Sequence, residues 1–273
     1  MFTEYVYWSH FLLLGGISME FMSSFNSDKG NVRKTNQDSL CIKVASTNKG
    51  NIAMGVVCDG MGGLTKGELA SATVIKAFAN WFDNVLPTMM GNLTINSVRE
   101  SWTDLIKKQN DILINYGSSR GINLGTTITA LLIVDDDFWV IAHVGDSRAY
   151  KIKDNIEMLT EDQTVVQLEV RRGKISPEEA EFDSRNNVLL QCCGCFDDVT
   201  PIFSYGNVDK NCIYMLCSDG FRHRITPMEM YQFLNPLINY DESTMQKNAM
   251  KLVELNKFRR EEDNISVLMI RTA

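Results

Sequence analysis

The hydrophobic residues of the chain follow two different spacings, and these predict its elements. Short apolar runs typical of strands come first, and two long segments with apolar residues at helical spacing follow. The expected strands cover residues 21–26, 39–45 and 52–58. The expected helices run from residue 67 to about 85 and from about 95 to 116.

The second half of the sequence repeats this order of strands and then helices. Strands are predicted at 126–134, 138–144 and 149–152, with the polar turn Asp135-Asp136-Asp137 between the first two. A short helix at 165–172, a charged loop at 173–187, strands at 199–205 and 212–217, helices at 227–234 and 243–258, and a strand at 265–271 complete the chain. Strands in hairpins and helices in adjacent pairs predict an α+β fold with mainly antiparallel sheets covered by helices.

Composition narrows the class of protein. The chain has 273 residues, of which 44% are hydrophobic, and 27 Lys and Arg oppose 34 Asp and Glu, giving a formal charge of −7. This excludes a disordered chain and disfavours nucleic acid as a partner, since nucleic acid favours basic surfaces. With only 3 His, a site built from several histidines is disfavoured, whereas the many carboxylates suit hard cations.

The cysteines and the first residues indicate where the protein resides. Seven Cys in a chain of this length indicate reduced thiols in a cytoplasmic protein. Cys192 and Cys195 have C-x-x-C spacing, but without a second pair we expect buried apolar side chains rather than a zinc or redox site. The apolar stretch 11–17 is much shorter than the roughly 20 residues that span a bilayer, and Glu4 replaces the basic start of a signal peptide. We therefore expect neither export nor a membrane partner.

Residues 1–18 have an unusual feature. Gly15-Gly16 lies two codons before Met19, an arrangement that a translated ribosome-binding site would produce. We interpret 1–18 as a non-native or disordered leader, with Met19 as the natural start. Residues 19–273 are then expected to form a single domain.

Five aspartates lie at the ends of predicted strands: Asp38, Asp59, Asp146, Asp219 and Asp263. A single Asp beside a small residue usually marks a turn. Five in this position are expected to converge at one edge of the sheets, where they cannot all remain ionised without counter-charge. Ligands that offer only oxygen select Mg²⁺, Mn²⁺ or Ca²⁺ over zinc. Two such ions about 3.5–4 Å apart can share a hydroxide and drive in-line attack on phosphorus.

The surrounding motifs carry a family resemblance. From about residue 24 to the end, the chain resembles the bacterial type of the metal-dependent PPM/PP2C serine/threonine protein phosphatases. The motifs, in order, are Gly30-Asn31-Val32-Arg33-x-x-Asn36-Gln37-Asp38, Asp59-Gly60-Met61-Gly62-Gly63, Gly67-Glu68-x-Ala70-Ser71, Gly125-Thr126-Thr127, Val144-Gly145-Asp146-Ser147-Arg148-x-Tyr150, Leu159-Thr160-x-Asp162, Ser218-Asp219-Gly220 and Asp263-Asn264-Ile265-Ser266-Val267.

The resemblance implies an α-β-β-α sandwich of two mainly antiparallel sheets, with Mn²⁺ or Mg²⁺ at one end. It implies two ions, bridged by Asp59, and a third ion as seen in bacterial members. The Gly60 carbonyl is implied to bind one of the two ions, and Asp219 and Asp263 are implied to bind the first. Asp146 together with Asp219 is implied to bind the third ion. Asp38 is implied to orient the bridging nucleophilic water, and Arg33 to clamp the substrate phosphate. Residues 165–187 fall where the family has a mobile flap.

Three positions depart from the family pattern. Met61 stands where many members have a His proposed as general acid, so we expect metal-bound water or another group to protonate the leaving oxygen. Gln37 replaces a Glu that often contacts a metal through water, which weakens one site. Gln163 replaces a His after Asp162, and we expect little consequence.

One arginine and two histidines near the motifs have different expected roles. Arg148 is expected to be a structural ion-pair partner and His143 a packed strand residue, whereas His223 stays open between a structural role and contact with substrate. The predicted function is hydrolysis of phosphoserine and phosphothreonine in proteins by a metal-bridging hydroxide, in a monomer that opposes a bacterial Ser/Thr kinase. The alternatives are a catalytically weak or inactive binding module of the same fold and a dedicated phosphatase for an anti-sigma partner.

Overall fold

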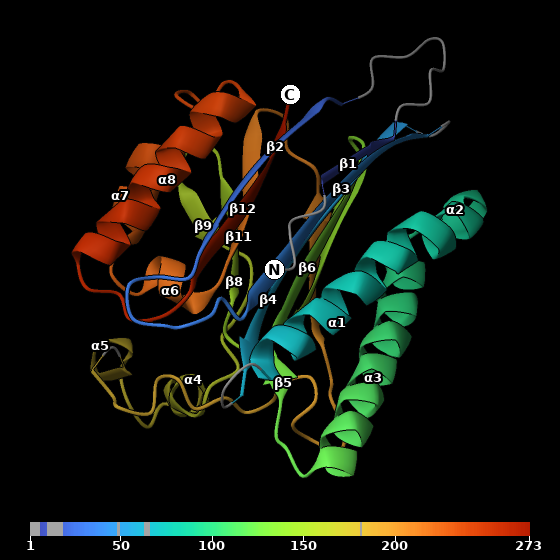
Figure 1. The fold of residues 1–273 in the computed structure, drawn as a ribbon. Helices are drawn as coiled ribbons and strands as arrows, with labels where there is room; N and C mark the ends of the chain where they lie inside the picture. Colours follow the sequence, from blue (N-terminus) through green and yellow to red (C-terminus); the bar gives the residue numbers. More distant parts are fainter. Residues whose placement is uncertain (1–5, 10–18, 48–49, 63–65, 181) are drawn as a thin grey trace.

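The computed structural model describes residues 6–9, 19–47, 50–62, 66–180 and 182–273. Two sheets pack face to face, and helices cover the outer face of each (Figure 1). The predicted α+β sandwich of mainly antiparallel sheets is therefore confirmed. Within the described ranges, every helix is too short or too polar to cross a bilayer.

The first sheet is built mainly from strands of the first 144 residues, with one edge strand from later in the chain. Its order is β1 (Val6–Ser9), β3 (Asp38–Thr47), β4 (Gly50–Met61), β6 (Ile128–Val134), β7 (Phe138–Val144) and β10 (Ile202–Asn207). The short β5 (Gly125–Thr126) pairs with the end of β4. Of these pairings, β1 with β3 is parallel and the others are antiparallel.

The second sheet is antiparallel throughout its described pairings. Its order is β2 (Phe21–Asp28), β12 (Ile265–Thr272), β11 (Cys212–Cys217), β8 (Arg148–Ile152) and β9 (Ile156–Met158). The closing strand β12 thus lies between β2 and β11. This brings the two ends of the described domain together, and the Glu20 and Ala273 backbones exchange hydrogen bonds.

Two groups of helices cover the sheets (Figure 1). The first sheet is covered by α1 (Lys66–Asn80), which continues through a π-helical turn (Trp81–Val85) into α2 (Leu86–Met89), and by α3 (Ile95–Arg120). The second is covered by α7 (Pro227–Leu234) and α8 (Glu242–Phe258). The short helices α4 (Val165–Arg171), α5 (Pro177–Ala180) and α6 (Asp219–Arg222) lie at the lower end of the sandwich in Figure 1.

Three apolar layers follow from the alternation of side chains along the strands. In β4, Ile52, Met54 and Val56 pack toward α1 and α3, whereas Ala53 and Val57 face the second sheet. In β11, the corresponding sets are Ile213, Met215 and Cys217 against the helices and Cys212, Tyr214 and Leu216 between the sheets. Strands buried on both faces form the rigid frame from which the site residues project.

Most predicted elements match the structure, but several short ones were missed. The strand β9 and the helix α6 were not predicted, since each is too short to show a period. The prediction of a loop at 173–187 was wrong for Pro177–Ala180, which form the single-turn helix α5. The leader prediction for 1–18 falls on residues of which the structure describes only β1, and it stays a prediction. The described domain resumes at Met19, whose backbone N–H donates to Asp135 Oδ1 at 2.9 Å.

The cysteine expectation was wrong for one pair. The structure joins Cys192 and Cys195 in a disulfide with a Cα–Cα distance of 5.6 Å. The remaining cysteines are unpaired and buried, as expected. The two cysteines approach because the loop that carries them turns back on itself at Gly194, whose φ of 97° lies in the left-handed region.

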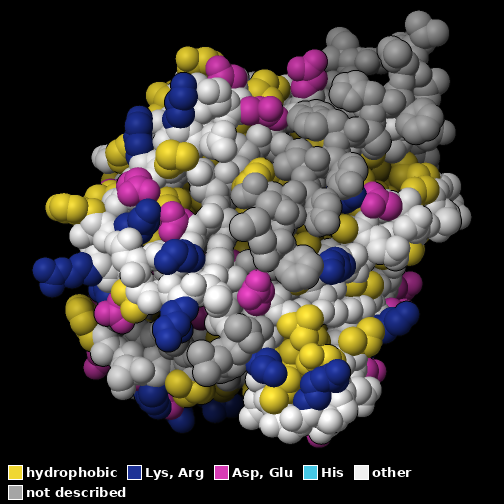
Figure 2. Space-filling model, in the orientation of Figure 1, with side chains coloured by type: hydrophobic (Ala, Val, Ile, Leu, Met, Phe, Trp, Pro, Cys, Tyr) yellow, Lys and Arg dark blue, Asp and Glu magenta, His cyan; other side chains and the backbone are white. Residues whose placement is uncertain are grey.

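The surface mixes charges of both signs. Lys, Arg, Asp and Glu side chains are interspersed over the face shown in Figure 2.

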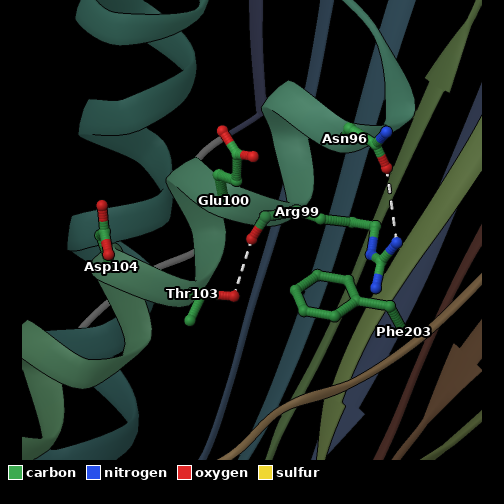
Figure 3. Close-up of a pocket in the computed structure, with 6 residues that line it drawn as sticks. All are labelled: Asn96, Arg99, Glu100, Thr103, Asp104 and Phe203. Atoms are coloured by element: carbon green, nitrogen blue, oxygen red, sulfur yellow. Dashed lines mark hydrogen bonds between the residues drawn. The ribbon is translucent and has the colours of Figure 1, made fainter.

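At the β10 edge of the first sheet, α3 meets β10 around a hollow of about 550 Å³ (Figure 3). There the Arg99 guanidinium lies 5.4 Å from the centre of the Phe203 ring and 5.8 Å from that of Tyr205, a cation–π arrangement.

Candidate metal centre

The predicted aspartates project from both sheets. β3 begins at Asp38, which is opposite Asp59 in the register of β3 and β4, so both side chains belong to the same end of the first sheet. Asp146 follows β7, Asp219 follows β11, and Asp263 precedes β12. Asp38, Asp146 and Asp219 are each less than a tenth exposed.

Hydrogen bonds join the two sheets at this end. The Ser218 hydroxyl, at the end of β11, donates to Asp38 Oδ2 at 2.8 Å. The Asn264 side chain accepts from the Gln37 backbone N–H at 2.8 Å and donates to the Thr35 carbonyl at 3.0 Å. The loop before β3 is therefore tied to the first residues of β12, which places Asp38 beside Asp219 and Asp263.

Two threonines hold the backbone of Asp59 through hydrogen bonds. Its N–H donates to Thr127 Oγ1 at 2.9 Å, and its carbonyl accepts from the Thr127 N–H and the Thr126 hydroxyl, both at 2.9 Å. The Gly-Thr-Thr motif, which alone meant little in the sequence, therefore positions the proposed bridging residue.

Close backbone contacts explain three glycines of the motifs. A Cβ on Gly60 would overlap the Gly67 carbonyl, and a Cβ on Gly67 would overlap that of Gly60, so the end of β4 touches the start of α1 directly. Similarly, a Cβ on Gly220 would overlap the Asn264 carbonyl. Only glycine permits these approaches, and they bring the Asp-bearing segments to one place.

The carboxylates influence one another's charge strongly. Burial raises the pKa of Asp59 well above its usual value, and the charges of Asp38, Asp219, Asp146 and Asp263 raise it further. Burial also raises the pKa of Asp38 to about 7, although hydrogen bonds from Ser266 and Ser218 lower it. The other four predicted aspartates therefore all lie within electrostatic reach of Asp59.

The donor set fits divalent cations that prefer oxygen. Asp38 Oδ1 and Asp219 Oδ1 are buried without a hydrogen-bond partner, an arrangement that is costly unless a cation or water compensates. Across the described part of the chain, however, no group of three His, Cys, Asp or Glu side chains is already arranged around one ion position. In Asp263, Oδ2 accepts from Arg33 and Oδ1 accepts from the Asn264 N–H. Each oxygen keeps a further lone pair that can face an ion.

Arg33 lies at the rim of the cluster. Its Nη2 donates to Asp263 Oδ2 at 2.7 Å, while half of its side chain is exposed. The hydrogen bond to Asp263 raises the pKa of Arg33, as do the charges of Asp263, Asp59 and Asp219, although burial opposes this. A planar guanidinium in this position can reach both the carboxylates and an incoming phosphate.

A second buried carboxylate, Asp162, lies near Asp146. Arg148 donates to both of its oxygens, at 2.8 and 2.7 Å, which confirms the structural ion pair predicted for Arg148. Arg222 Nη2 donates to Asp162 Oδ2 at 3.3 Å and to the Asp146 carbonyl at 3.2 Å, and it lies 4.0 Å from Asp146 Oδ2. Arg222 was not predicted to have a role, although its position just after Ser218-Asp219-Gly220 was an available signal.

Gln163 has a structural role that its motif did not predict. Its side chain is buried, accepts from the Gly145 N–H at 2.9 Å and donates to the His143 carbonyl at 3.3 Å. The same Oε1 accepts from Gln191 Nε2 at 2.9 Å. Gln163 thus holds the turn that presents Asp146, although we expected little consequence from this residue.

The two described histidines differ in environment. His143 is buried on β7, and its Nδ1 lies 3.0 Å from the Thr129 hydroxyl, as expected for a packed strand residue. Burial lowers the pKa of His143 to about 4. His223 lies between two carboxylates, with Nε2 3.5 Å from Asp219 Oδ2 and Nδ1 3.5 Å from Glu261 Oε1. Burial lowers its pKa, but hydrogen bonding to Glu261 and the charge of Asp219 raise it overall.

The segment that corresponds to the predicted flap borders a large cavity beside Asp146. It contains α4 and α5 joined by turns. The cavity has a volume of about 590 Å³, and its lining includes Asp162, Val166, Phe182, Arg222 and His223. Since Phe182 is 88% exposed, the segment offers apolar as well as charged groups next to the cluster.

Known proteins resemble the chain over most of its length. A family model described as protein phosphatase 2C matches residues 31–255. The serine/threonine phosphatase Stp of Listeria welshimeri is 30% identical over 254 residues, 91% of this chain and 94% of the relative. The structure of Stp1 from Staphylococcus aureus, a serine/threonine phosphatase, has a TM-score of 0.77 at 28% identity and covers 97% of this chain and 99% of its own. The catalytic domain of PstP, solved with 2 manganese ions, has a TM-score of 0.74 at 26% identity, covering 94% and 99%.

Proposed function

Because the chain belongs to the protein phosphatase 2C family, we propose that it removes phosphate from phosphoserine and phosphothreonine in proteins by metal-dependent hydrolysis. The observation that carries this proposal is the grouping of four acidic side chains around Asp59, whose pKa burial raises well above normal and these neighbouring charges raise further. Buried carboxylates in this arrangement need cations, and oxygen ligands select Mg²⁺ or Mn²⁺.

We propose Mn²⁺ or Mg²⁺ as the resident ions, supported by the two manganese ions of the PstP structure. Asp59 and the Gly60 carbonyl would hold them together with Asp219 and Asp263, and Asp146 with Asp219 would hold a third. When bound, the ions would acidify water and neutralise charge on the phosphate.

The chain's own groups have separate tasks in the proposed reaction. Asp38, held through Oδ2 by Ser218 and with Oδ1 unpartnered, orients the attacking water. Arg33 exchanges its bond to Asp263 for bonds to the substrate phosphate, so that substrate binding and freeing of an Asp263 oxygen go together. Met61 lies in the position of the family's proposed general acid and cannot donate a proton, so another group protonates the leaving oxygen.

The proposed setting is a bacterial cytoplasm, where the enzyme acts as a monomer and opposes a Ser/Thr kinase. Phosphorylated proteins are the substrate class that the named relatives support. The excess of Asp and Glu on the chain argues against nucleic acid as a further partner.

A phosphopeptide assay tests the proposal. The full chain, stripped with a chelator and resupplied with Mn²⁺, should release phosphate from a phosphothreonine peptide, whereas chelated protein should not. Asp219→Ala should remove the activity, because it removes a ligand with a buried unpartnered oxygen. Near-normal turnover by Asp219→Ala, or full activity in chelator, would refute the assignment of the metal centre.

A further inference from the structure

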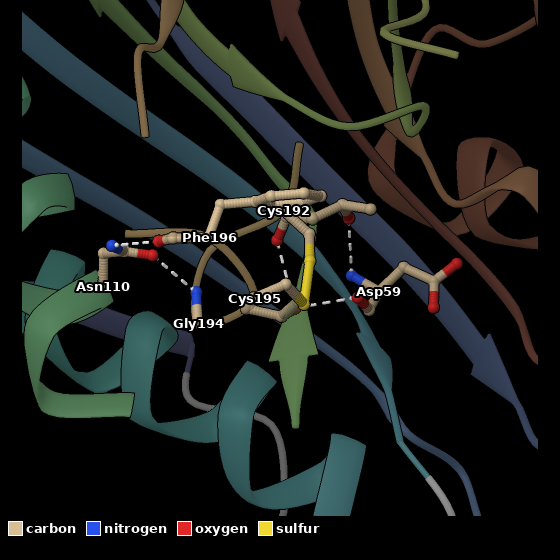
Figure 4. The surroundings of a disulfide bond; sticks show 8 residues. Asp59, Asn110, Cys192, Gly194, Cys195 and Phe196 are labelled. Atoms are coloured by element: carbon tan, nitrogen blue, oxygen red, sulfur yellow. Dashed lines mark hydrogen bonds between the residues drawn. A yellow bond between two sulfur atoms is a disulfide. The ribbon is translucent and has the colours of Figure 1, made fainter. Parts of the chain in front are cut away.

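The loop Cys192-Cys193-Gly194-Cys195 has a property that the phosphatase reaction does not use. Its outer cysteines form the disulfide described above, and Cys195 is exposed whereas Cys192 is only 2% exposed (Figure 4). The other cysteines of the chain are buried and unpaired. Solvent-borne oxidants and reductants can therefore reach this pair through Cys195.

One side of this loop supports Asp59. Cys193 and Thr126 exchange two backbone hydrogen bonds, each of 2.9 Å, and the Thr126 hydroxyl donates to the Asp59 carbonyl. A Cβ on Gly125 would overlap Cys195 Sγ, so the disulfide lies directly against β5. The short strand β5 therefore connects the disulfide to the backbone of Asp59.

The other side of the loop reaches Asp146. Gln191, the residue before Cys192, donates to Gln163 Oε1, which also accepts the N–H of Gly145 beside Asp146. Gln191 further bonds the Thr200 backbone through both its amide atoms, at 2.8 and 3.0 Å. Asn110 fixes the far end of the loop to α3, by accepting from the Gly194 N–H and donating to the Phe196 carbonyl (Figure 4). The cysteine loop thus connects two of the acidic residues that the proposed metal centre requires.

We propose that Cys192 and Cys195 form a redox modification site whose reactants are low-molecular-weight disulfides and thiols, and that its state tunes ion binding at Asp59. In the oxidising direction, the Cys195 thiolate attacks a disulfide RSSR and releases RS⁻. The Cys192 thiolate then attacks Cys195 Sγ and releases the second RS⁻. One protein S–S bond forms, the S–S bond of RSSR breaks, and the two thiol protons pass to the two RS⁻ ions.

The two states differ in how firmly β5 is held. In the dithiol the sulfurs separate beyond bonding distance, and the exposed Cys195 moves because Cys192 is enclosed. β5 then loses the disulfide that lies against Gly125, and the support for Asp59 through Thr126 becomes looser. Groups that orient metal ligands typically change ion affinity by about 10–100-fold when they are altered. The effect on ions, unlike the thiol chemistry, rests on the proposed function.

Thiol mapping on the full chain tests the site itself. The protein is equilibrated with glutathione disulfide or with reduced glutathione, labelled with iodoacetamide while folded, and mapped by peptide mass spectrometry. Cys192 and Cys195 should be protected together in the first buffer, and Cys195 should be labelled in the second. Equal labelling of Cys195 in both buffers, or a stable glutathione adduct on Cys195 in place of the internal disulfide, would overturn the proposal.

Binding of Mn²⁺ and amide exchange test the coupling without measuring turnover. Oxidised protein should bind Mn²⁺ about tenfold more tightly than reduced protein by calorimetry, and its Thr126 and Thr127 amides should exchange more slowly. Cys195→Ser should give the values of the reduced protein in both buffers, whereas Cys212→Ala, which changes a buried cysteine on β11, should respond like the unaltered chain. Identical Mn²⁺ affinity and identical amide exchange in both states would overturn the coupling. If the phosphatase proposal alone fails, the exchange difference at Thr126 and Thr127 remains.

Discussion

Two corners of the acidic site contain the same residue type in contrasting electrostatic surroundings. At the first corner, formed by Asp38 and Asp59, burial raises the pKa of both carboxyls, and Asp38 Oδ1 has no partner. At the second corner, formed by Asp146 and Asp162, the arginines Arg148 and Arg222 approach the acids. The pKa of Asp162 is lowered even though burial opposes this, because Arg148 and Arg222 stabilise its charge.

The contrast shows which part of the site the chain stabilises by itself. Asp162 carries its charge with protein counter-ions, whereas Asp38 and Asp59 require cations from solution. Asp146 lies between the two cases, since burial and Asp219 raise its pKa to about 7 although Arg222 lowers it. Substitutions of the acids at the first corner should therefore mainly affect activity, and loss of an arginine at the second should mainly affect stability.

The largest expected effect is at the first corner. Asp59→Asn keeps the shape of the side chain but removes the charge shared with four other carboxylates, and activity on a phosphopeptide in Mn²⁺ should fall at least about a thousandfold. Asp136→Asn, in the exposed turn between β6 and β7, is the matched control and should keep full activity. Substantial turnover by Asp59→Asn would show that the first corner does not hold the catalytic ions.

At the second corner, removal of a buried arginine should destabilise the fold. Arg222→Gln leaves Asp146 and Asp162 short of counter-charge, and the free energy of unfolding should fall by about 2–3 kcal/mol in urea titrations. Arg259→Gln, which breaks a more exposed pair with Glu229, should lower the free energy of unfolding far less. Equal losses in the two variants would remove the distinction between the corners.

Arg33 joins the first corner to the substrate, and its removal should have a smaller effect. Arg33→Ala should raise KM for a phosphopeptide about tenfold, with a lesser change in kcat, because a guanidinium that binds phosphate contributes mainly to substrate affinity. Arg33→Lys should recover only part of the loss, since an ammonium lacks the planar fork. An unchanged KM in Arg33→Ala would place the phosphate elsewhere.

The smallest expected effect is a dependence of stability on pH in chelated protein. Asp38 titrates near 3.8 when unfolded and at about 7 when folded, so the folded state binds more protons between these values and stability falls as pH rises through them. His143, with its pKa lowered to about 4, acts oppositely between about 4 and 6.5, but Asp59 and Asp146 reinforce Asp38. Chelated protein should therefore melt several degrees lower at pH 7.5 than at pH 5, and Asp38→Asn should reduce the difference. A melting temperature that rises with pH over this range would contradict the assignment.

The sequence predicted the frame and the acidic residues better than it predicted their supports. Apolar period and length identified both ends of β7 and the start of α3, because both elements bury a continuous face, whereas α3 ends at Arg120 rather than near 116. The aspartates were identifiable because each follows or precedes an apolar strand. Arg222 and Gln163 were missed as supports, since a residue that acts through a neighbour's backbone leaves no periodic signal. The disulfide was missed because C-x-x-C spacing does not report whether a loop turns its two cysteines toward each other.

The contact between Gly60 and Gly67 has a mechanical consequence for the enzyme. No side-chain atom separates the two backbones, so the start of α1 packs directly against the strand that carries Asp59. Any mutation that displaces the first turn of α1 is therefore transmitted directly to the centre. Loss-of-function variants from a random library should accordingly include buried positions of α1 next to this turn, such as Ala70 and Ser71.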